Sequence, residues 1–431
     1  MSTISKRRPS RIRHKPQGLI AALDIGCSKI SCLIGAQRPD DPAHFEFRGG
    51  GRQQSRGFEG GVVTDMEALE RAVRLAVEDA ERQAGEAISS VILSVTGPKL
   101  TAEIKTASLS VSGRPIGSKD VRKVQTMAVD SAKQKGRDIL TAFPVVYKID
   151  DQEGIRDPRG MYGEELSAVI SIVSAPSSLI KTLLECVGRA HLTVDQIVPA
   201  AIAAGYGSLV DDERENGAIC VDMGAGVTTT SIFLNGVPAW ISFVPSGGQH
   251  VTSDLAQGLG TTFAAAERVK TLYGGIDPNG TGASERVECP VLGDDGRLQA
   301  GRRPRGELAQ IIRPRIEELL ELTTQRLSAS PMRSVMPHRV VFTGGASQIR
   351  DLKTLAETKL GLKVRCAKPL AANALGDAYS GPAFSTASGL LTYYLSGTPD
   401  VLRPAEAGGD PESEANLGWV KKALKWLREN F

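Results

Sequence analysis

Two segments of this 431-residue chain share one layout, which constrains the fold more than any other feature of the sequence. In each, an apolar run ends at an aspartate, a glycine follows two residues later, and a second apolar run begins after a few small residues. The segments are LDIGCSKI at residues 23–30 and VDMGAGVTT at residues 221–229. Two buried strands joined by a tight turn account for this pattern. Because the layout recurs 198 residues apart, from Asp24 to Asp222, the sequence predicts two similar α/β halves.

The two turns are chemically suited to a nucleotide. A glycine leaves backbone N–H groups accessible to phosphate oxygens, and an aspartate at a strand end can hold Mg²⁺, usually through water. Two such turns facing each other would hold a nucleotide between them. Taken singly, each turn is equally well explained as an ordinary β-turn.

The motifs that follow narrow the choice. A Ser-Gly-Gly segment occupies residues 246–248, the next helical stretch carries Glu267 and Lys270, and TGGASQI occupies residues 343–349. With the two turns, and in this order, these segments resemble the phosphate-one, phosphate-two and adenosine motifs of the actin-like ATPase superfamily. That superfamily includes actin, DnaK-type chaperones and sugar kinases. The resemblance implies an actin-like (ribonuclease H-like) α/β fold of two halves, with ATP and Mg²⁺ between them.

The resemblance also assigns roles to individual residues. It makes Asp24 and Asp222 the carboxylates that organise Mg²⁺. Around the phosphates it places Gly26, Cys27, Ser28, Lys29, Gly224, Ala225, Gly226, Val227, Thr228, Gly247 and Gly248. At the ribose, adenine or adenosine it places Glu267, Lys270, Gly344, Gly345, Ala346 and Gln348. A solvated ion pair is the alternative for Glu267 and Lys270, and Cys27 is a weaker donor than the Thr or Ser usual in these families.

The segment at residues 86–165 indicates which family of this superfamily the chain resembles. It contains short alternating strands and a helix from Ser118 to Gln134, which predicts a small inserted α+β subdomain. Together with the segments at residues 56–85, 245–270 and 341–352, this insert resembles the FtsA family of bacterial division proteins. The resemblance covers nearly all of residues 17–396 and the C-terminal tip.

The chain is therefore expected to have six parts. These are a basic, disordered tail at 1–16, a first half at 17–85 and 166–198, the insert at 86–165, a second half at 199–396 with an outer subdomain at about 263–335, a flexible acidic linker at 397–415 and an amphipathic helix at 416–431.

The FtsA resemblance implies a cytoplasmic, ATP-binding protein that polymerises and tethers FtsZ filaments, the Z ring, to the inner membrane. It also implies that the outer subdomain holds the C-terminal peptide of FtsZ and that later division proteins are recruited. A basic cluster in that region suits acidic peptide groups, with a solvated loop as the alternative. The cluster consists of Arg302, Arg303, Arg305 and Arg315.

The last 16 residues, NLGWVKKALKWLRENF, predict an amphipathic helix that binds anionic lipid. Its apolar side holds Trp419, Val420, Ala423, Leu424, Leu427 and Phe431; its basic side holds Lys421, Lys422, Lys425 and Arg428; Trp426 lies at the boundary. A helix docked on the protein's own body is the alternative. The acidic linker favours the membrane, because a docked helix would not need it.

Charge and composition exclude other classes. The net charge of +3 gives no reason to expect nucleic-acid binding, and no apolar stretch is long enough to span a bilayer. Six scattered cysteines without a CxxC pair indicate reduced thiols and a cytosolic compartment. With the FtsA resemblance and the amphipathic C-terminal segment, the expected location is the cytoplasmic face of the inner membrane at the division site, where the chain would be a peripheral protein.

The sequence leaves two alternative functions open. One is a sugar kinase or chaperone-like ATPase, although no base near an acceptor and no substrate domain can be identified. The other is the related pilus-assembly adaptor family, against which the terminal helix argues. Since no residue can be named that positions an attacking water, we expect tight nucleotide binding with weak or no ATPase activity.

Overall fold

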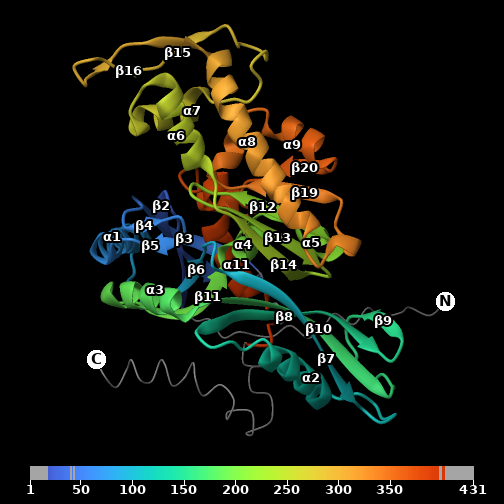
Figure 1. Cartoon of the computed structure of the whole chain (residues 1–431). Helices are drawn as coiled ribbons and strands as arrows, with labels where there is room; N and C mark the ends of the chain where they lie inside the picture. The colour runs from blue at the N-terminus through green and yellow to red at the C-terminus, as the bar shows by residue number, and fades with distance from the viewer. Residues whose placement is uncertain (1–17, 39–40, 42–43, 398–399, 403–431) are drawn as a thin grey trace, which may run out of the picture.

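The computed structural model describes residues 18–38, 41, 44–397 and 400–402. The predicted basic tail and the predicted amphipathic helix, with all of its expected lipid contacts, lie outside this range. Within the described residues, no helix is long and apolar enough to cross a bilayer. Figure 1 shows two sheets on either side of central helices, with a third sheet at one end of the molecule.

The first sheet consists of β1 (Leu19–Ile25), β2 (Lys29–Gln37), β3 (Phe45–Gln54), β6 (Ser90–Val95) and β11 (Thr193–Pro199). Its strand order is β11-β6-β1-β2-β3. The first three strands form an antiparallel meander, while β6 and β11 add in parallel. β1 and β6 are almost continuously apolar and buried, as central strands covered on both faces should be.

The second sheet repeats this arrangement. It consists of β12 (Ala218–Met223), β13 (Thr228–Leu234), β14 (Val237–Val244), β19 (Arg339–Thr343) and β20 (Lys363–Cys366), in the order β14-β13-β12-β19-β20. The first three strands are again an antiparallel meander, and β19 and β20 again add in parallel. The predicted pair of similar α/β halves is thus confirmed by matching strand order and direction.

Two helices lie between the sheets, namely α4 (Ala200–Ser208) and α11 (Ser385–Ser396). α11 packs on β1 and β6, α4 packs on β12 and β13, and the two helices pack on each other. Small residues allow this close crossing: a Cβ added to Gly389 would lie 1.8 Å from the carbonyl oxygen of Ala203. The halves are therefore joined through a tight helix pair.

The third sheet consists of β7 (Thr101–Ser110), β8 (Arg137–Ile149), β9 (Gln152–Ile155) and β10 (Glu165–Pro176), in the order β7-β10-β8-β9. Helix α2 (Ser118–Ser131) packs on β7 and β10. We call this sheet with its helix the four-stranded domain. It is an insertion within the first half and meets the second half along β14.

The strands at either end of this insertion pair differently from the sequence expectation. β6, expected inside the insert, lies between β1 and β11 in the first sheet, and β10, expected in the first half, pairs with β7 and β8. Alternation of apolar residues identifies a strand but carries no information on its partners, which are distant in sequence.

Helices cover the outer faces of the sheets. α1 (Met66–Ala84) is capped at its start by Asp65, whose carboxylate accepts hydrogen bonds from the N–H groups of Glu67 and Ala68, and it ends at Gly85. The other helices are α3 (Ser177–Arg189), α5 (Asp211–Asn216), α6 (Gly248–Leu259), α7 (Phe263–Tyr273), α8 (Arg305–Ser328), α9 (Leu352–Leu360) and α10 (Ala372–Leu375). The remaining short strands are β4 (Phe58–Glu59), β5 (Val62–Val63), β15 (Arg286–Glu288), β16 (Val291–Leu292), β17 (Leu298–Gln299) and β18 (Arg302–Pro304).

The last described residues dock on the four-stranded domain. Asp400 is buried, and its carboxylate accepts a hydrogen bond from the Ala142 N–H at 3.0 Å. Val401 donates its N–H to the Ala142 carbonyl at 2.8 Å, and Val401 and Leu402 pack against the core of that domain. Composition places the start of the linker at residue 397, whereas the structure holds the chain against β8 as far as residue 402.

Candidate functional site

The two Asp-x-Gly turns have the same hydrogen-bond geometry. In the first, which joins β1 to β2, Gly26 donates its N–H to the Lys29 carbonyl at 3.1 Å. In the second, which joins β12 to β13, Gly224 donates to the Val227 carbonyl, also at 3.1 Å. The equivalence of the turns follows from the equivalence of the sheets that carry them.

Each turn presents one partly buried aspartate. Asp24 accepts a hydrogen bond from the Ser94 hydroxyl at 2.6 Å, and Asp222 accepts one from the Thr386 hydroxyl at 3.0 Å. Burial raises the pKa of Asp24. Burial, and then the negative charge of Asp24, raise the pKa of Asp222 to about 6. Two carboxylates from opposite halves therefore lie close enough to repel each other, and a shared cation would relieve that repulsion.

This donor set fits Mg²⁺ that keeps several of its waters. Mg²⁺ is usually bound in proteins by one or two carboxylates together with water and phosphate oxygens. Among the described residues, no group of three or more His, Cys, Asp or Glu side chains forms a complete metal cage. Two carboxylates match the number that such an ion takes from a protein when a nucleotide supplies its other ligands.

Lys29 adds a cation beside the two carboxylates. Burial lowers the pKa of Lys29, whereas the charges of Asp24 and Asp222 raise it. Its ammonium group donates to the Ala383 carbonyl and lies 4.3 Å from the centre of the Phe384 ring. The first turn is therefore connected to the segment that leads into α11.

Cys27 links the first turn to the second. Its sulfur lies near the backbone N–H groups of Gly60, Gly61 and Gly226, although burial outweighs these contacts and raises the thiol pKa. A Cβ added to Gly226 would lie 2.9 Å from that sulfur. The Gln249 side chain donates to the Cys27 carbonyl at 3.4 Å. Cys27 therefore faces the second half.

The second turn is held by the segment that starts α6. Gly248 and Gln249 donate their N–H groups to the carbonyls of Gly224 and Ala225 at 2.9 and 2.8 Å. The buried Thr228 hydroxyl donates to the Ser246 carbonyl at 2.9 Å. The Ser-Gly-Gly segment and the second turn thus form one unit.

The predicted adenosine motif lies beside this unit. Gly344 has a φ of 86°, and a Cβ there would lie 2.2 Å from a carboxylate oxygen of Asp222, so this close approach requires glycine. A Cβ on Gly248 would lie 3.2 Å from the Cβ of Ala346 and 3.5 Å from the Lys270 ammonium. The three motifs therefore converge on one place from three distant parts of the sequence.

Glu267 and Lys270 form an ion pair that is only partly solvated. The Lys270 ammonium contacts the Glu267 carboxylate at 2.7 Å, the Thr252 hydroxyl at 2.8 Å and the Gly248 carbonyl at 2.9 Å. The Lys270 side chain is 11% exposed and that of Glu267 is 46% exposed. The pair thus joins α7 to the start of α6 and leaves one carboxylate accessible.

Two sequence-predicted residues contribute less to this convergence. Ser28 is exposed, with its carbonyl accepting the Ser55 N–H at 2.9 Å. Gln348 is exposed, and its amide donates to the Gly345 carbonyl at 3.2 Å. Neither side chain contacts another predicted site residue from a different motif in the described structure.

Sequence patterns missed three residues that orient this site, namely Ser94, Gln249 and Thr386. Ser94 left a signal, since it is the one polar residue near the end of the apolar strand β6. Gln249 directly follows the Ser-Gly-Gly segment. Thr386 left none, because it reaches Asp222 from 164 residues away.

The predicted basic cluster is not a single free patch. Arg315 contacts Asp254 on α6 at 2.7 and 3.0 Å, and Arg305 contacts Glu285 at 2.6 Å. Arg303 lies 3.6 Å from Glu307. Arg302 is exposed in β18 and is the member best placed to meet a partner.

A groove of about 330 Å³ lies nearby, between α7 and the short hairpins. Leu272 and Leu298 line it and are about half exposed, and Arg268 and Glu288 add charge at its margin. Its other lining residues are Thr262, Ala264, Ala265, Val269, Tyr273 and Pro290. The outer part of the second half thus carries an apolar groove close to Arg302.

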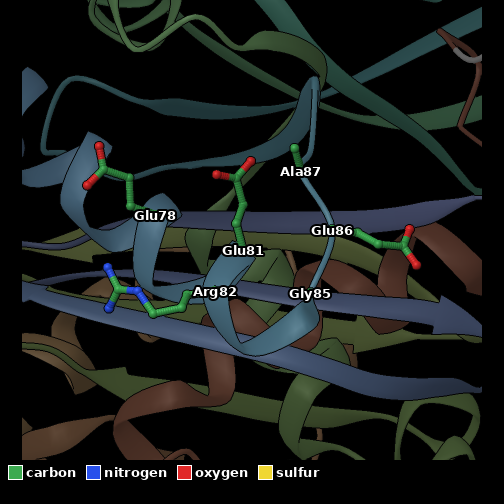
Figure 2. Close-up of a pocket in the computed structure, with 6 residues that line it drawn as sticks. All are labelled: Glu78, Glu81, Arg82, Gly85, Glu86 and Ala87. Carbon is green, nitrogen blue, oxygen red and sulfur yellow. The ribbon is translucent and has the colours of Figure 1, made fainter.

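A separate depression of about 440 Å³ lies at the end of α1 and is open to solvent (Figure 2). Glu78, Glu81 and Glu86 line it, with Arg82 as the one cation. It contains no residue of the three converging motifs, and its carboxylates would repel phosphate. We therefore do not assign it to the nucleotide.

Comparison with known proteins places the chain in a family. A family profile described as "Cell division protein FtsA" matches residues 219–389, and one described as "SHS2 domain inserted in FTSA" matches residues 97–174. The chain is 38% identical over 429 residues to a cell division protein FtsA of Agrobacterium fabrum, covering 97% of this chain and 96% of that one. It is 32% identical to that of Escherichia coli strain K12, covering 97% of this chain and all of that one.

Solved structures support the fold. The chain is similar to a structure titled "PilM-PilN type IV pilus biogenesis complex", with a TM-score of 0.63 and 16% identity, covering 89% of this chain and all of that one. It is also similar to MreB5 of Spiroplasma citri bound to ADP, with a TM-score of 0.53 and 12% identity, covering 88% and 98%. At these identities the likeness shows the actin-like fold alone. The sequence relatives decide the family: the chain belongs to the FtsA family of bacterial cell division proteins.

Proposed function

We propose that this chain binds ATP with Mg²⁺ between its two halves, self-associates, and holds FtsZ filaments at the cytoplasmic face of the inner membrane. The observation that carries the nucleotide proposal is the pairing of Asp24 and Asp222 across two equivalent glycine turns. Burial, and then the negative charge of Asp24, raise the pKa of Asp222 to about 6, as expected of a carboxylate that lacks the cation it would share.

The residues of the site have separable roles in this proposal. Asp24 and Asp222 would hold Mg²⁺ through water, and the ion would neutralise part of the phosphate charge. Backbone N–H groups of the two turns would bind phosphate oxygens, with Lys29 as the cation of the first turn. Lys270 and Glu267 would orient the ribose, and Gly344 and Gly345, which carry no side chains, would leave room for the adenosine.

Attachment to the membrane and to FtsZ rests on other parts of the chain. The C-terminal residues 416–431 would bind anionic lipid, as their amphipathic pattern predicts. The groove beside α7 would bind the C-terminal peptide of FtsZ, with Arg302 as the cation for acidic groups of that peptide. Self-association would multiply the weak lipid affinity of each copy, because every added subunit brings another anchor. The self-associated chains would also recruit later division proteins.

Substitution of the carboxylates tests the nucleotide site. Asp222→Ala and Asp24→Ala should each weaken Mg²⁺-dependent binding of a fluorescent ATP analogue at least about tenfold, since a buried charged contact is typically worth 1.5–3 kcal/mol. Asp212→Ala, which removes an exposed carboxylate from α5, should leave the affinity within about twofold. Unchanged affinity in both site variants would refute the assignment.

Turnover of ATP by the unaltered chain is expected to be slow.

A further inference from the structure

We propose that the solvent-facing side of α2 in the four-stranded domain is a second lipid contact, which binds the headgroups of anionic lipid beside the place where the C-terminal segment leaves the body. This inference rests on the proposed membrane function and adds a contact to it.

The basic stripe of α2, defined as Lys119, Arg122 and Lys123, carries the proposal. These residues are exposed and spaced so that they share one helical face. None of the three forms an ion pair within the described residues. Met127, 40% exposed, continues the same face and adds an apolar side chain of the kind that enters the interfacial region of a bilayer.

The two acids of α2 do not cancel this charge. Asp120 is buried and contacts Arg114 at 2.6 and 2.7 Å and the Gly117 N–H at 2.9 Å. The hydrogen bonds from Arg114 lower the pKa of Asp120 to about 2, so Asp120 is ionised at neutral pH. The positive charge of Arg114 lies directly beside it. Asp130 contacts Lys133 at 2.7 Å. The stripe therefore presents three positive charges, none of which forms an ion pair with an acid of α2.

The end of the described chain brings the membrane to this domain. Asp400 anchors the chain to β8 through Ala142, and Val401 and Leu402 pack against the apolar cluster that also contains Val124 and Ala128 of α2. The last described residues before the predicted lipid-binding segment thus lie on the domain that carries the stripe. Figure 1 shows α2 on the outer side of this domain, at the opposite end of the molecule from α9.

Only 13 residues separate Leu402 from the predicted amphipathic segment in the sequence. Electrostatic attraction to lipid fades over about 8 Å at physiological salt, so a basic surface must lie close to the bilayer to bind it. Anionic headgroups supply the complementary charge.

Vesicle co-sedimentation of the full chain tests the proposal. The triple charge reversal Lys119→Glu, Arg122→Glu, Lys123→Glu is compared with the unaltered chain on vesicles with about 30% phosphatidylglycerol. A Lys or Arg near an anionic surface contributes about fivefold in affinity, so the triple variant should bind at least about tenfold more weakly. The matched control is Lys353→Glu, Lys363→Glu, Lys368→Glu, which changes the net charge equally on exposed residues of the α9 and β20 side, and it should stay within about twofold.

A truncated chain in the same assay distinguishes a failure of this proposal from a failure of the proposed membrane function. A chain ending at Glu414 should lose most binding; if it pellets like the full chain, the C-terminal tether is wrong whatever the stripe does. If truncation removes binding while the stripe and control variants behave alike, the stripe proposal is overturned and the tether stands. Stronger lipid binding by the stripe variant would also overturn it, and would mean that the stripe binds the acidic residues of the linker. Unchanged nucleotide affinity and melting temperature confirm that the triple variant is folded.

Discussion

The raised pKa of Asp222 predicts that this residue favours the folded state less at neutral pH than at acidic pH. Its pKa is raised to about 6 from the ordinary 3.8, by burial and by the charge of Asp24. A carboxyl group with a raised pKa binds its proton more tightly in the folded state than in the unfolded state. Its contribution is therefore most favourable below about pH 4 and is lost as the pH rises through about 6.

Asp222→Asn should consequently stabilise the nucleotide-free protein at pH 7.5 while weakening nucleotide binding. Two pKa units correspond to about 3 kcal/mol, and a gain of about 2 kcal/mol, or roughly 2 °C in melting temperature, is expected after the amide replaces the carboxylate. Thermal unfolding in EDTA at pH 5 and pH 7.5 measures this gain, which should shrink at pH 5. Asp212→Asn serves as the exposed control. A lower melting temperature for Asp222→Asn at pH 7.5 would show that the carboxylate is structural.

Among individual residues, sequence patterns predict those that form the two Asp-x-Gly turns but not those whose side chains hydrogen-bond to the turns. Asp24, Asp222 and the turn glycines follow from short local patterns, because a tight turn needs particular residues at fixed offsets. Thr386 and Gln249 are ordinary polar residues in the chain. Their importance depends on which element lies next to the turn, and a single sequence does not contain that information.

The packing of α1 on β3 depends on two glycines. Gly49 and Gly51 point towards the helix, and a Cβ on Gly51 would lie 1.9 Å from the Ala76 carbonyl oxygen. Since that neighbour is helix backbone, it cannot move aside cheaply. The helix therefore approaches the strand more closely than any larger residue would allow.

Gly51→Ala should lower the free energy of unfolding by about 3 kcal/mol, because the added methyl group forces α1 away from the sheet. Gly188→Ala on the exposed side of α3 is the matched control; nothing lies within 4 Å of its added Cβ, so it should be neutral or slightly stabilising. Denaturant titrations of both variants measure the difference. Equal midpoints for the two variants would mean that α1 can shift without cost.

Element types were easier to predict than element partners. The amphipathic pattern of α1 and the apolar runs of β1 and β12 identify those elements directly. The short alternating strands at residues 86–165 predict the insertion, but not which strands belong to it. β6 pairs within the first sheet, and β10 pairs within the sheet of the four-stranded domain. Pairing is decided by contacts such as Ala22 with Ile92, which are 70 residues apart, and by burial on both strand faces.

At the scale of the molecule, few side chains cross directly between the halves near the site. Gln249 reaches Cys27, Lys29 reaches Ala383, and the Tyr379 hydroxyl donates to the Gly50 carbonyl. Away from the site, α4 and α11 join the halves, and the four-stranded domain meets β14. A ligand held by both Asp24 and Asp222 would add a bridge where the protein itself supplies little, and should therefore act on both halves together.

Mg²⁺ and ATP should accordingly slow hydrogen exchange in both turns, at residues 26–29 and at 224–227, by similar factors. At a ligand concentration of 100 times Kd, linkage stabilises the bound state by about 2.7 kcal/mol, which corresponds to about 100-fold slower exchange for amides that open only in the free state. Amides of α2, in a different domain, should be unaffected and serve as the internal control. Asp222→Ala should abolish protection in the first turn as well as in its own, because the bridge needs both carboxylates. Protection confined to one turn would mean that the nucleotide binds to one half alone and that the equivalence of the two turns is structural.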